Sequence, residues 1–146
     1  MTEEKKSSIQ HLDKEDIEEI HENLSEEEEK EGEPIPPFRF DNSPDIDALV
    51  STPKQSFFGR EAYPTIEEKA AIIFYTINKR QIFLNGNKRM STACLLVFLG
   101  LNNRQLVVKP DELTKKALWL ANTSSLEFQQ IKVELVDWIK KNLRER

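Results

Sequence analysis

Residues 81–89 have the composition of a phosphate-binding loop, with the sequence Gln-Ile-Phe-Leu-Asn-Gly-Asn-Lys-Arg. Gly86 has no side chain, so the backbone at this position can approach an anion closely. A helix that begins near Asn87 would offer unpaired N–H groups and the positive end of its dipole. Lys88 and Arg89 add full positive charges. These residue types and their spacing predict an anion site over residues 86–89.

The same loop lacks groups that could transfer a proton or hold a metal ion firmly. Gln81 carries an amide, which does not titrate near neutral pH. Asn85 also carries an amide, where a carboxylate would hold a divalent cation. The loop is therefore predicted to bind a phosphate better than it catalyses a reaction.

Two apolar helices are predicted to hold this loop at both ends. The first follows Thr65-Ile66-Glu67-Glu68, which has the pattern of a capping box, and extends through Lys79 with apolar residues at helical spacing. The second begins near Asn87 and is apolar on all faces through Leu101, which predicts a central, buried helix. A loop between packed helices has the rigidity that a preorganised anion site needs.

The rest of the sequence also predicts mainly helical structure. Asp13 is the expected cap of the first helix, which the acidic, proline-containing stretch 25–37 is expected to end. Residues 51–64 contain two prolines, a glycine and paired phenylalanines, which indicates a loop or a small hairpin. The expected helices cover residues 12–24, 44–50, about 110–122 and about 125–143.

Composition limits the chain to one modest core, because 146 residues with 38% hydrophobic content are too few for two ordinary domains. Cys94 lies in an apolar helical run and is expected in the core, whereas His11 and His21 are expected at the surface or at helix caps. The sequence shows no apolar segment long enough to span a bilayer and no charged-then-apolar leader. A cytoplasmic protein without membrane contact is therefore expected.

Charge is distributed unevenly along a chain whose formal net charge is −5. Acidic residues strongly outnumber basic ones in residues 1–37, whereas basic residues are in excess in residues 38–146. A basic body suits a phosphate-bearing ligand. The lysines and arginines are spread over several helices and form no aromatic-laced stripe, so nucleic acid is not an expected partner.

The loop resembles the signature of the Fic/Doc (Fido) superfamily, H-x-F-x-[D/E]-x-N-[K/G]-R. The residues in register with this signature are Phe83, Asn87, Lys88 and Arg89. The lysine favours the Doc, or death-on-curing, branch. Four segments before the loop also resemble elements of this family, so that the resemblance covers roughly residues 10–101. These segments are 12–24, 35–38, 57–65 and 67–79. Gln81 stands where the family has its catalytic histidine, and Asn85 stands where it has the acidic residue that binds magnesium.

This resemblance implies a mainly α fold, namely a compact Fido helical bundle with a small β-hairpin called the flap. A single domain over residues 10–146 is expected, with a disordered tail over 1–9 and an acidic linker at about 25–37. In this family the flap pairs with the backbone of the target protein. Phe57 and Phe58 are candidates for docking the target, although paired aromatics in a short loop can equally anchor it to the domain's own core.

The resemblance also implies a chemistry. Fido proteins transfer a nucleoside monophosphate, or in Doc a phosphate, from a nucleotide such as ATP to a hydroxyl of a target protein. The implied nucleotide-binding residues are Gly86, Asn87, Lys88 and Arg89. Gln81 replaces the catalytic base, whose loss lowers a rate by roughly 10²–10⁴-fold. Asn85 replaces the metal ligand, so binding of Mg²⁺ is expected to be weak or lost.

Three functions remain open. The first is a Doc-like domain that binds a nucleotide or another phosphate and transfers poorly or not at all. The second is an active toxin kinase or nucleotidyltransferase of a toxin–antitoxin system, which would use another base, such as Glu61, or the substrate itself. The third is a non-enzymatic protein-interaction module. Besides a protein target, a separate antitoxin is the implied partner. An internal inhibitory helix is not indicated, because Glu18 stands where its [S/T]-x-x-x-E-[G/N] pattern requires Ser or Thr.

Overall fold

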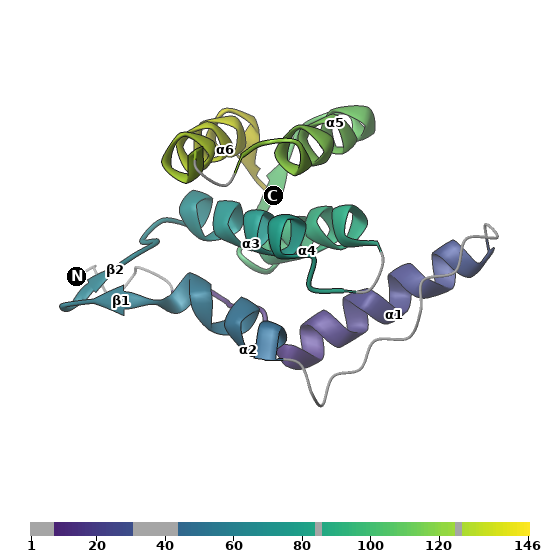
Figure 1. Cartoon of the computed structure of the whole chain (residues 1–146), viewed down its shortest axis with the longest axis horizontal. Coiled ribbons are helices and arrows are strands. Elements are labelled where there is room, and N and C mark those ends of the chain that lie inside the picture. The colour runs from purple at the N-terminus through teal and green to yellow at the C-terminus, as the bar shows by residue number, and fades with distance from the viewer. Residues whose placement is uncertain (1–7, 31–43, 84–85, 125–126) are drawn as a thin grey trace.

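The computed structural model describes residues 8–30, 44–83, 86–124 and 127–146, and it confirms a mainly α fold (Figure 1). The helices are α1 (Lys14–Lys30), α2 (Pro44–Ser51), α3 (Ile66–Arg80), α4 (Asn87–Leu101), α5 (Pro110–Ala121) and α6 (Phe128–Asn142), with a 3₁₀ helix, η2, at Thr52–Lys54. The strands are β1 (Ser56–Phe57), β2 (Arg60–Glu61), β3 (Arg104–Leu106) and β4 (Leu143–Glu145). In the described part of the chain, no helix is long and apolar enough to cross a membrane.

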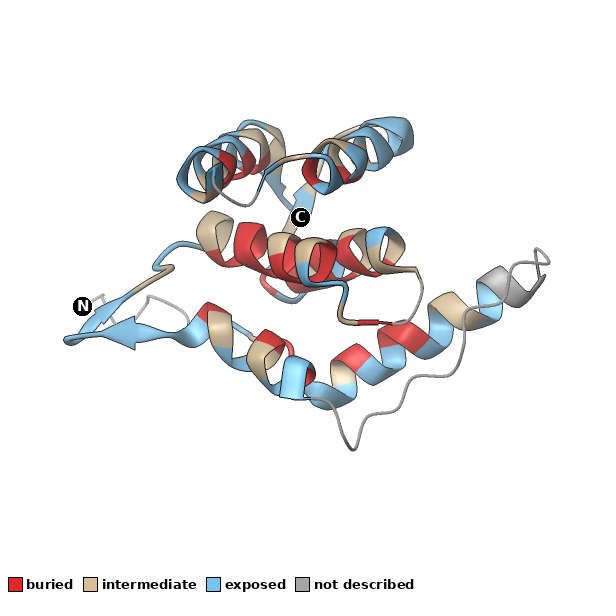
Figure 2. Cartoon of the chain, viewed as in Figure 1, coloured by how far each residue is buried: buried red, intermediate tan, exposed pale blue. Residues whose placement is uncertain are grey.

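The central layer consists of α3 and α4, with α5 and α6 on one side and α1 and α2 on the other (Figure 1). Figure 2 shows that buried residues are concentrated on the central pair. The predicted apolar stripe of α3 is buried and consists of Ala70, Ile73, Phe74 and Ile77. Full burial of an Ile or Phe side chain stabilises a fold by roughly 1.5–3 kcal/mol. The central pair is therefore a firm support for the loop that joins its two helices.

Both predicted helix caps are present. Thr65 Oγ1 accepts the N–H of Glu68 at 3.0 Å, and Thr65 N donates to Glu68 Oε1 at 3.2 Å, which confirms the capping box. Asp13 Oδ1 accepts the N–H of Asp16 at 2.8 Å. In return, Asp13 N donates to Asp16 Oδ2 at 3.0 Å. Caps of this kind stabilise a helix by about 1 kcal/mol, so local sequence sets the starts of α1 and α3.

The predicted end of the first helix is wrong. Helix α1 does not stop near Ser25 but continues to Lys30. Residues 25–30 are mostly glutamate, and glutamate and lysine are good helix formers, so acidity alone does not end a helix. The first strong helix breaker is Gly32, which lies outside the described residues together with the rest of the expected linker. The segment 35–38 and residues 1–7 of the tail expected over 1–9 also lie outside them, whereas Ile9 is partly buried and packs against the core.

Helix α4 is central, as predicted, but it is not buried on every face. Met90, Cys94 and Phe98 are fully enclosed. In contrast, Leu96, Val97 and Leu101 are 38–41% exposed, since no element that the structure describes covers this face. The sequence pattern could not distinguish the two outcomes, because all faces of this helix carry apolar residues.

A second small sheet, which no sequence pattern predicted, lies beyond the C-terminal end of α4. Strand β3 pairs antiparallel with β4, with Arg104 opposite Glu145 and Leu106 opposite Leu143. The N–H of Arg146 also donates to Asn103 O at 3.1 Å. Strands of three residues are too short to show a period-2 pattern. The pairing ties the end of the chain to the central layer.

Candidate phosphate-binding site

The connection between α3 and α4 begins with Gln81, which is exposed at the surface. Its backbone is left-handed, with φ 50° and ψ 56°, and its N–H donates to Ile77 O at 3.2 Å. Left-handed residues other than glycine are uncommon, and here the conformation ends α3 and turns the chain. The amide of Gln81 is thus accessible from solvent at the start of the loop, but it cannot serve as a base at neutral pH.

Phe83 anchors the loop to α1. Its side chain is 5% exposed, and its ring stacks on His21 with the ring centroids 5.4 Å apart and the planes 26° apart. The prediction that His21 lies at the surface or at a cap is wrong, because this residue is only 3% exposed. Burial lowers the pKa of His21, which favours the neutral imidazole. Helix α1 therefore supports the loop through a buried aromatic pair.

His11, the other histidine expected at the surface, is partly buried, and its ring lies 6.5 Å from that of Phe98. Burial is also the main cause that lowers the pKa of His11, with a smaller contribution from the charge of Lys69. Neither histidine belongs to a candidate metal site, because the described residues contain no cluster of three or more His, Cys, Asp or Glu able to hold an ion.

Asn87 closes the loop on itself. Its Oδ1 accepts the N–H of Phe83 at 2.9 Å, and its Nδ2 donates to Phe83 O at 2.8 Å. This pair of bonds, which we call the Phe83–Asn87 clamp, joins the first residue of α4 to the backbone four residues earlier. Asn87 therefore has a structural role that sequence reasoning did not foresee, and its role as a phosphate ligand stays a prediction. Asn85 lies outside the described residues, so its expected loss of magnesium binding also stays a prediction.

The start of α4 is a favourable place for an anion. Gly86 is the N-cap, with a left-handed φ of 75°, and the first turn of α4 contains no acidic residue. Glycine has no side chain that could cap the first N–H groups. Lys88 is exposed, whereas Arg89 is partly buried, with its Nε enclosed by protein. A helix N-terminus is equivalent to about half a positive charge, to which these two cations add.

Lys79 lies just before the loop, but its ammonium group does not join Lys88 and Arg89 at the start of α4. Its Nζ donates to Leu120 O at 3.2 Å, to Thr123 O at 2.6 Å and to Thr123 Oγ1 at 3.1 Å. These acceptors lie at the C-terminal end of α5 and just after it, where carbonyl groups have no partner within the helix. Lys79 thus fastens the end of α3 to α5.

The expected hairpin is present. Strands β1 and β2 pair antiparallel, and Phe58 and Gly59 form the turn with φ values of 53° and 79°. Two left-handed residues are what a type I′ hairpin turn requires. Phe57 is 60% exposed and Phe58 is fully exposed, so neither anchors the hairpin to the core. A bulky side chain at positive φ is strained, and such strain is often found at binding sites.

The hairpin and the loop lie at opposite ends of α3 (Figure 1). This helix has 15 residues. At 1.5 Å per residue it separates them by about 20 Å. The structure therefore brings together Phe83, Gly86 and Asn87, but it does not place Phe57 and Phe58 beside them.

Glu61, a candidate substitute for the missing base, is engaged elsewhere. Its Oε1 accepts a hydrogen bond from Lys69 Nζ at 2.9 Å. This bond, together with the charge of Lys69, lowers the pKa of Glu61 and makes its carboxylate a weaker base. Sequence reasoning missed Lys69, although a lysine directly before Ala70, within the apolar stripe of α3, was an available signal. The geometry does not support Glu61 as the base.

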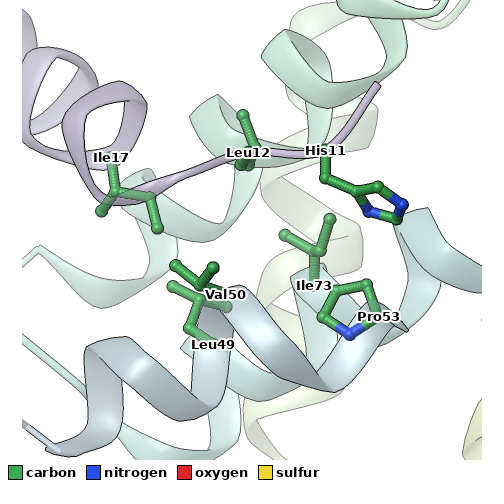
Figure 3. A pocket seen from close by; sticks show the side chains of 7 residues that line it. All are labelled: His11, Leu12, Ile17, Leu49, Val50, Pro53 and Ile73. Carbon is green, nitrogen blue, oxygen red and sulfur yellow. The ribbon is translucent and has the colours of Figure 1, made fainter. Parts of the chain in front are cut away.

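A small cavity lies among α1, α2 and α3, and Figure 3 shows the side chains that converge on it. Its lining consists of His11, Leu12, Ile17, Leu49, Val50, Pro53 and Ile73. Its volume is about 10 Å³, which is room for about one water molecule and far too little for a nucleotide. It is a packing defect of the core, and the loop remains the candidate ligand site.

The segment that contains the hairpin and the loop matches a known family. A model described as the Fic/DOC family matches residues 11–99, which is more than half of the chain. The chain is also 33% identical over 66 residues to Toxin Doc of Mycolicibacterium smegmatis. That match covers 45% of this chain and 51% of the relative, so the chain matches about half the length of this protein. The family match includes the loop with its Phe83–Asn87 clamp and most of the two helices that hold it, and this chain therefore belongs to the Fic/DOC family.

Proposed function

We propose that this protein is a Doc-like domain that binds a nucleotide or another phosphate at the start of α4, and that it transfers phosphate or AMP to a protein hydroxyl poorly or not at all. The observation that carries the proposal is the left-handed glycine N-cap, Gly86, with Lys88 and Arg89 in a first turn of α4 that contains no acidic residue. Backbone N–H groups, a helix dipole and two cations together form a favourable phosphate site. The Phe83–Asn87 clamp would preorganise it.

Gln81 supports the impaired transfer. Its amide cannot remove a proton from an attacking hydroxyl at neutral pH, and loss of a positioned base lowers a rate by roughly 10²–10⁴-fold. The neutral side chain of Asn85 is a weaker ligand for Mg²⁺ than a carboxylate. This donor does not fit a firmly held magnesium ion, and magnesium therefore has no assigned role in the proposed function.

The relative named Toxin Doc favours a second candidate, an active toxin of a toxin–antitoxin system. Such a protein would modify a protein target and would be restrained by an antitoxin. It would have to rely on positioning and electrostatic stabilisation, which contribute most of the catalysis in phosphoryl transfer.

The exposed hairpin favours a third candidate, a protein-interaction module without enzymatic activity. Phe57 and Phe58 present a large aromatic surface to solvent at the tip of a short hairpin. Aromatic side chains contribute strongly to protein interfaces. In this case the loop would keep its shape without binding a nucleotide.

Transfer can be tested with ATP labelled at either the α or the γ phosphate, together with magnesium and a bacterial lysate. The wild type is expected to label proteins weakly or not at all, and the Gln81→His/Asn85→Asp variant is expected to label them. Efficient labelling by the wild type would contradict impaired transfer and support the active toxin. The labelled position would identify the transferred group as phosphate or AMP.

Nucleotide binding is tested separately by thermal unfolding with and without ATP. A ligand at 100 times its Kd stabilises the folded state by about 2.7 kcal/mol, so the melting temperature should rise by several degrees. The rise should be lost in Lys88→Ala/Arg89→Ala and kept in Lys140→Ala, which removes an exposed lysine from α6. An unchanged melting temperature in the wild type would refute nucleotide binding and leave the interaction module.

A further inference from the structure

Lys69 carries a charge but is only 1% exposed. Burial of an ammonium group is strongly unfavourable unless it is paired and hydrogen-bonded. Here the Nζ donates to Pro53 O at 3.0 Å, to Glu61 Oε1 at 2.9 Å and to Tyr63 O. An ammonium group has three protons, so each has an acceptor.

The three acceptors lie on both sides of the β1–β2 hairpin. Pro53 belongs to η2, before β1, whereas Glu61 belongs to β2 and Tyr63 follows it. Lys69 itself lies in the first turns of α3, which the Thr65 capping box and the buried apolar stripe hold firmly. One side chain from a rigid helix thus binds both ends of the hairpin.

Among the described residues, few other contacts support the hairpin. Each strand has two residues, and an isolated two-stranded hairpin is at best marginally stable. Beyond the strands, the N–H of Ala62 donates to Gln55 O at 2.9 Å. The exposed aromatic side chains at positions 57 and 58 contribute no packing against the core. After the hairpin, the ring of Tyr63 faces Lys132 Nζ at 5.1 Å. The buried ammonium is therefore the main link between the hairpin and the central layer.

We propose that Lys69 is a positioning residue, which holds both ends of the hairpin against α3 and so fixes the direction in which Phe57 and Phe58 project toward a protein partner. The partner in this inference rests on the proposed function, whereas the positioning role rests on the contacts of Lys69 alone. Because the phosphate-binding loop lies at the other end of α3, Lys69 acts on the hairpin and not on nucleotide binding.

Amide hydrogen exchange tests this role. Lys69→Met keeps the length of the side chain and removes its charge and its donors. Exchange at residues 55–62 is expected to rise about tenfold, while exchange in α4 changes less than about twofold, because local opening differs between parts of a fold. Lys69→Arg, which keeps a charge and donors, should restore most of the protection. The matched control is Lys115→Met, which removes an exposed lysine whose Nζ lies 3.7 Å from Asp111 on α5; it should leave the hairpin unchanged.

Two results would overturn the proposal: equal exchange at the hairpin in Lys69→Met and Lys115→Met, or an equal rise at the hairpin and in α4. If Lys69→Met does not fold, Glu61→Ala decides, since it removes an exposed acceptor and should raise exchange at the hairpin about threefold. Unchanged exchange in that variant would also reject the positioning role of Lys69.

ATP should raise the melting temperature of the wild type and Lys69→Met alike. If ATP raises the melting temperature of neither protein, the proposed function alone is refuted. The role of Lys69 is then still tested by amide hydrogen exchange.

Discussion

Asn87→Ala is the substitution that most directly tests how the loop is held. It removes two hydrogen bonds between the side chain and the backbone of Phe83, at 2.9 and 2.8 Å. Each contributes about 0.5–1.5 kcal/mol to stability. Alanine is the better helix former at the first residue of α4, which offsets up to about 0.5 kcal/mol. The expected loss in the free energy of unfolding is therefore about 1.5 kcal/mol, and the melting temperature should fall by roughly 5 °C.

The assay is urea denaturation followed by the fluorescence of Trp119 and Trp138, with thermal unfolding as a second measurement. Asn142→Ala is the matched control, because Asn142 makes one such bond, from Nδ2 to Trp138 O at 2.8 Å, and lies away from the loop. Its expected loss is about 1 kcal/mol or less. The reasoning is refuted if Asn87→Ala is as stable as the wild type. It is also refuted if Asn87→Ala loses stability but binds ATP with unchanged affinity, since a loosened loop could not remain a preorganised site.

Three further predictions concern single side chains. Burial lowers the pKa of His21 below 6.5, so the unfolded state binds a proton more readily and stability should fall as the pH drops below about 6.5. In His21→Phe the difference in unfolding free energy between pH 8 and pH 5 should be smaller than in the wild type. An unchanged difference would contradict this cause. Phe58→Asn should raise stability by roughly 0.5–1 kcal/mol in urea denaturation, because Asn-Gly suits a type I′ turn and the exposed phenylalanine loses no burial; a less stable variant would show that Phe58 is not strained. Burial raises the pKa of Cys94 to about 12, so a thiol reagent at pH 8 should label the unfolded protein but not the native one, and rapid native labelling would argue against the buried position.

Local sequence signals predicted much of this fold. The capping box at Thr65, the cap at Asp13 and the apolar stripe of α3 each depend on residues within one or two helical turns, and each is confirmed. The hairpin at residues 56–61 was indicated by its glycine and its flanking prolines. The predicted start of a helix near Asn87 is confirmed, and Gly86, the N-cap before it, has a left-handed backbone that glycine adopts readily.

Features that depend on distant partners could not be predicted from the sequence. His21 is buried only because α1 packs against the loop near Phe83, 62 residues further along the chain. The pairing of β3 with β4 joins segments on either side of two helices. Lys69 can be buried because Pro53 and Tyr63 turn their carbonyl groups, and Glu61 its carboxylate, toward the ammonium group. In each case the same residues would be unremarkable on a different arrangement of helices.

The Phe83–Asn87 clamp has a consequence for how such proteins can diverge. Its two hydrogen bonds join the side chain of Asn87 to the backbone of Phe83 and involve no side-chain atom of Gln81, so a substitution at Gln81 can leave the clamp in place. Every glutamine codon is a single base away from a histidine codon, and every asparagine codon is a single base away from an aspartate codon. Point mutation can therefore exchange the side chains at Gln81 and Asn85 in a lineage that keeps Phe83 and Asn87, and with them the clamp.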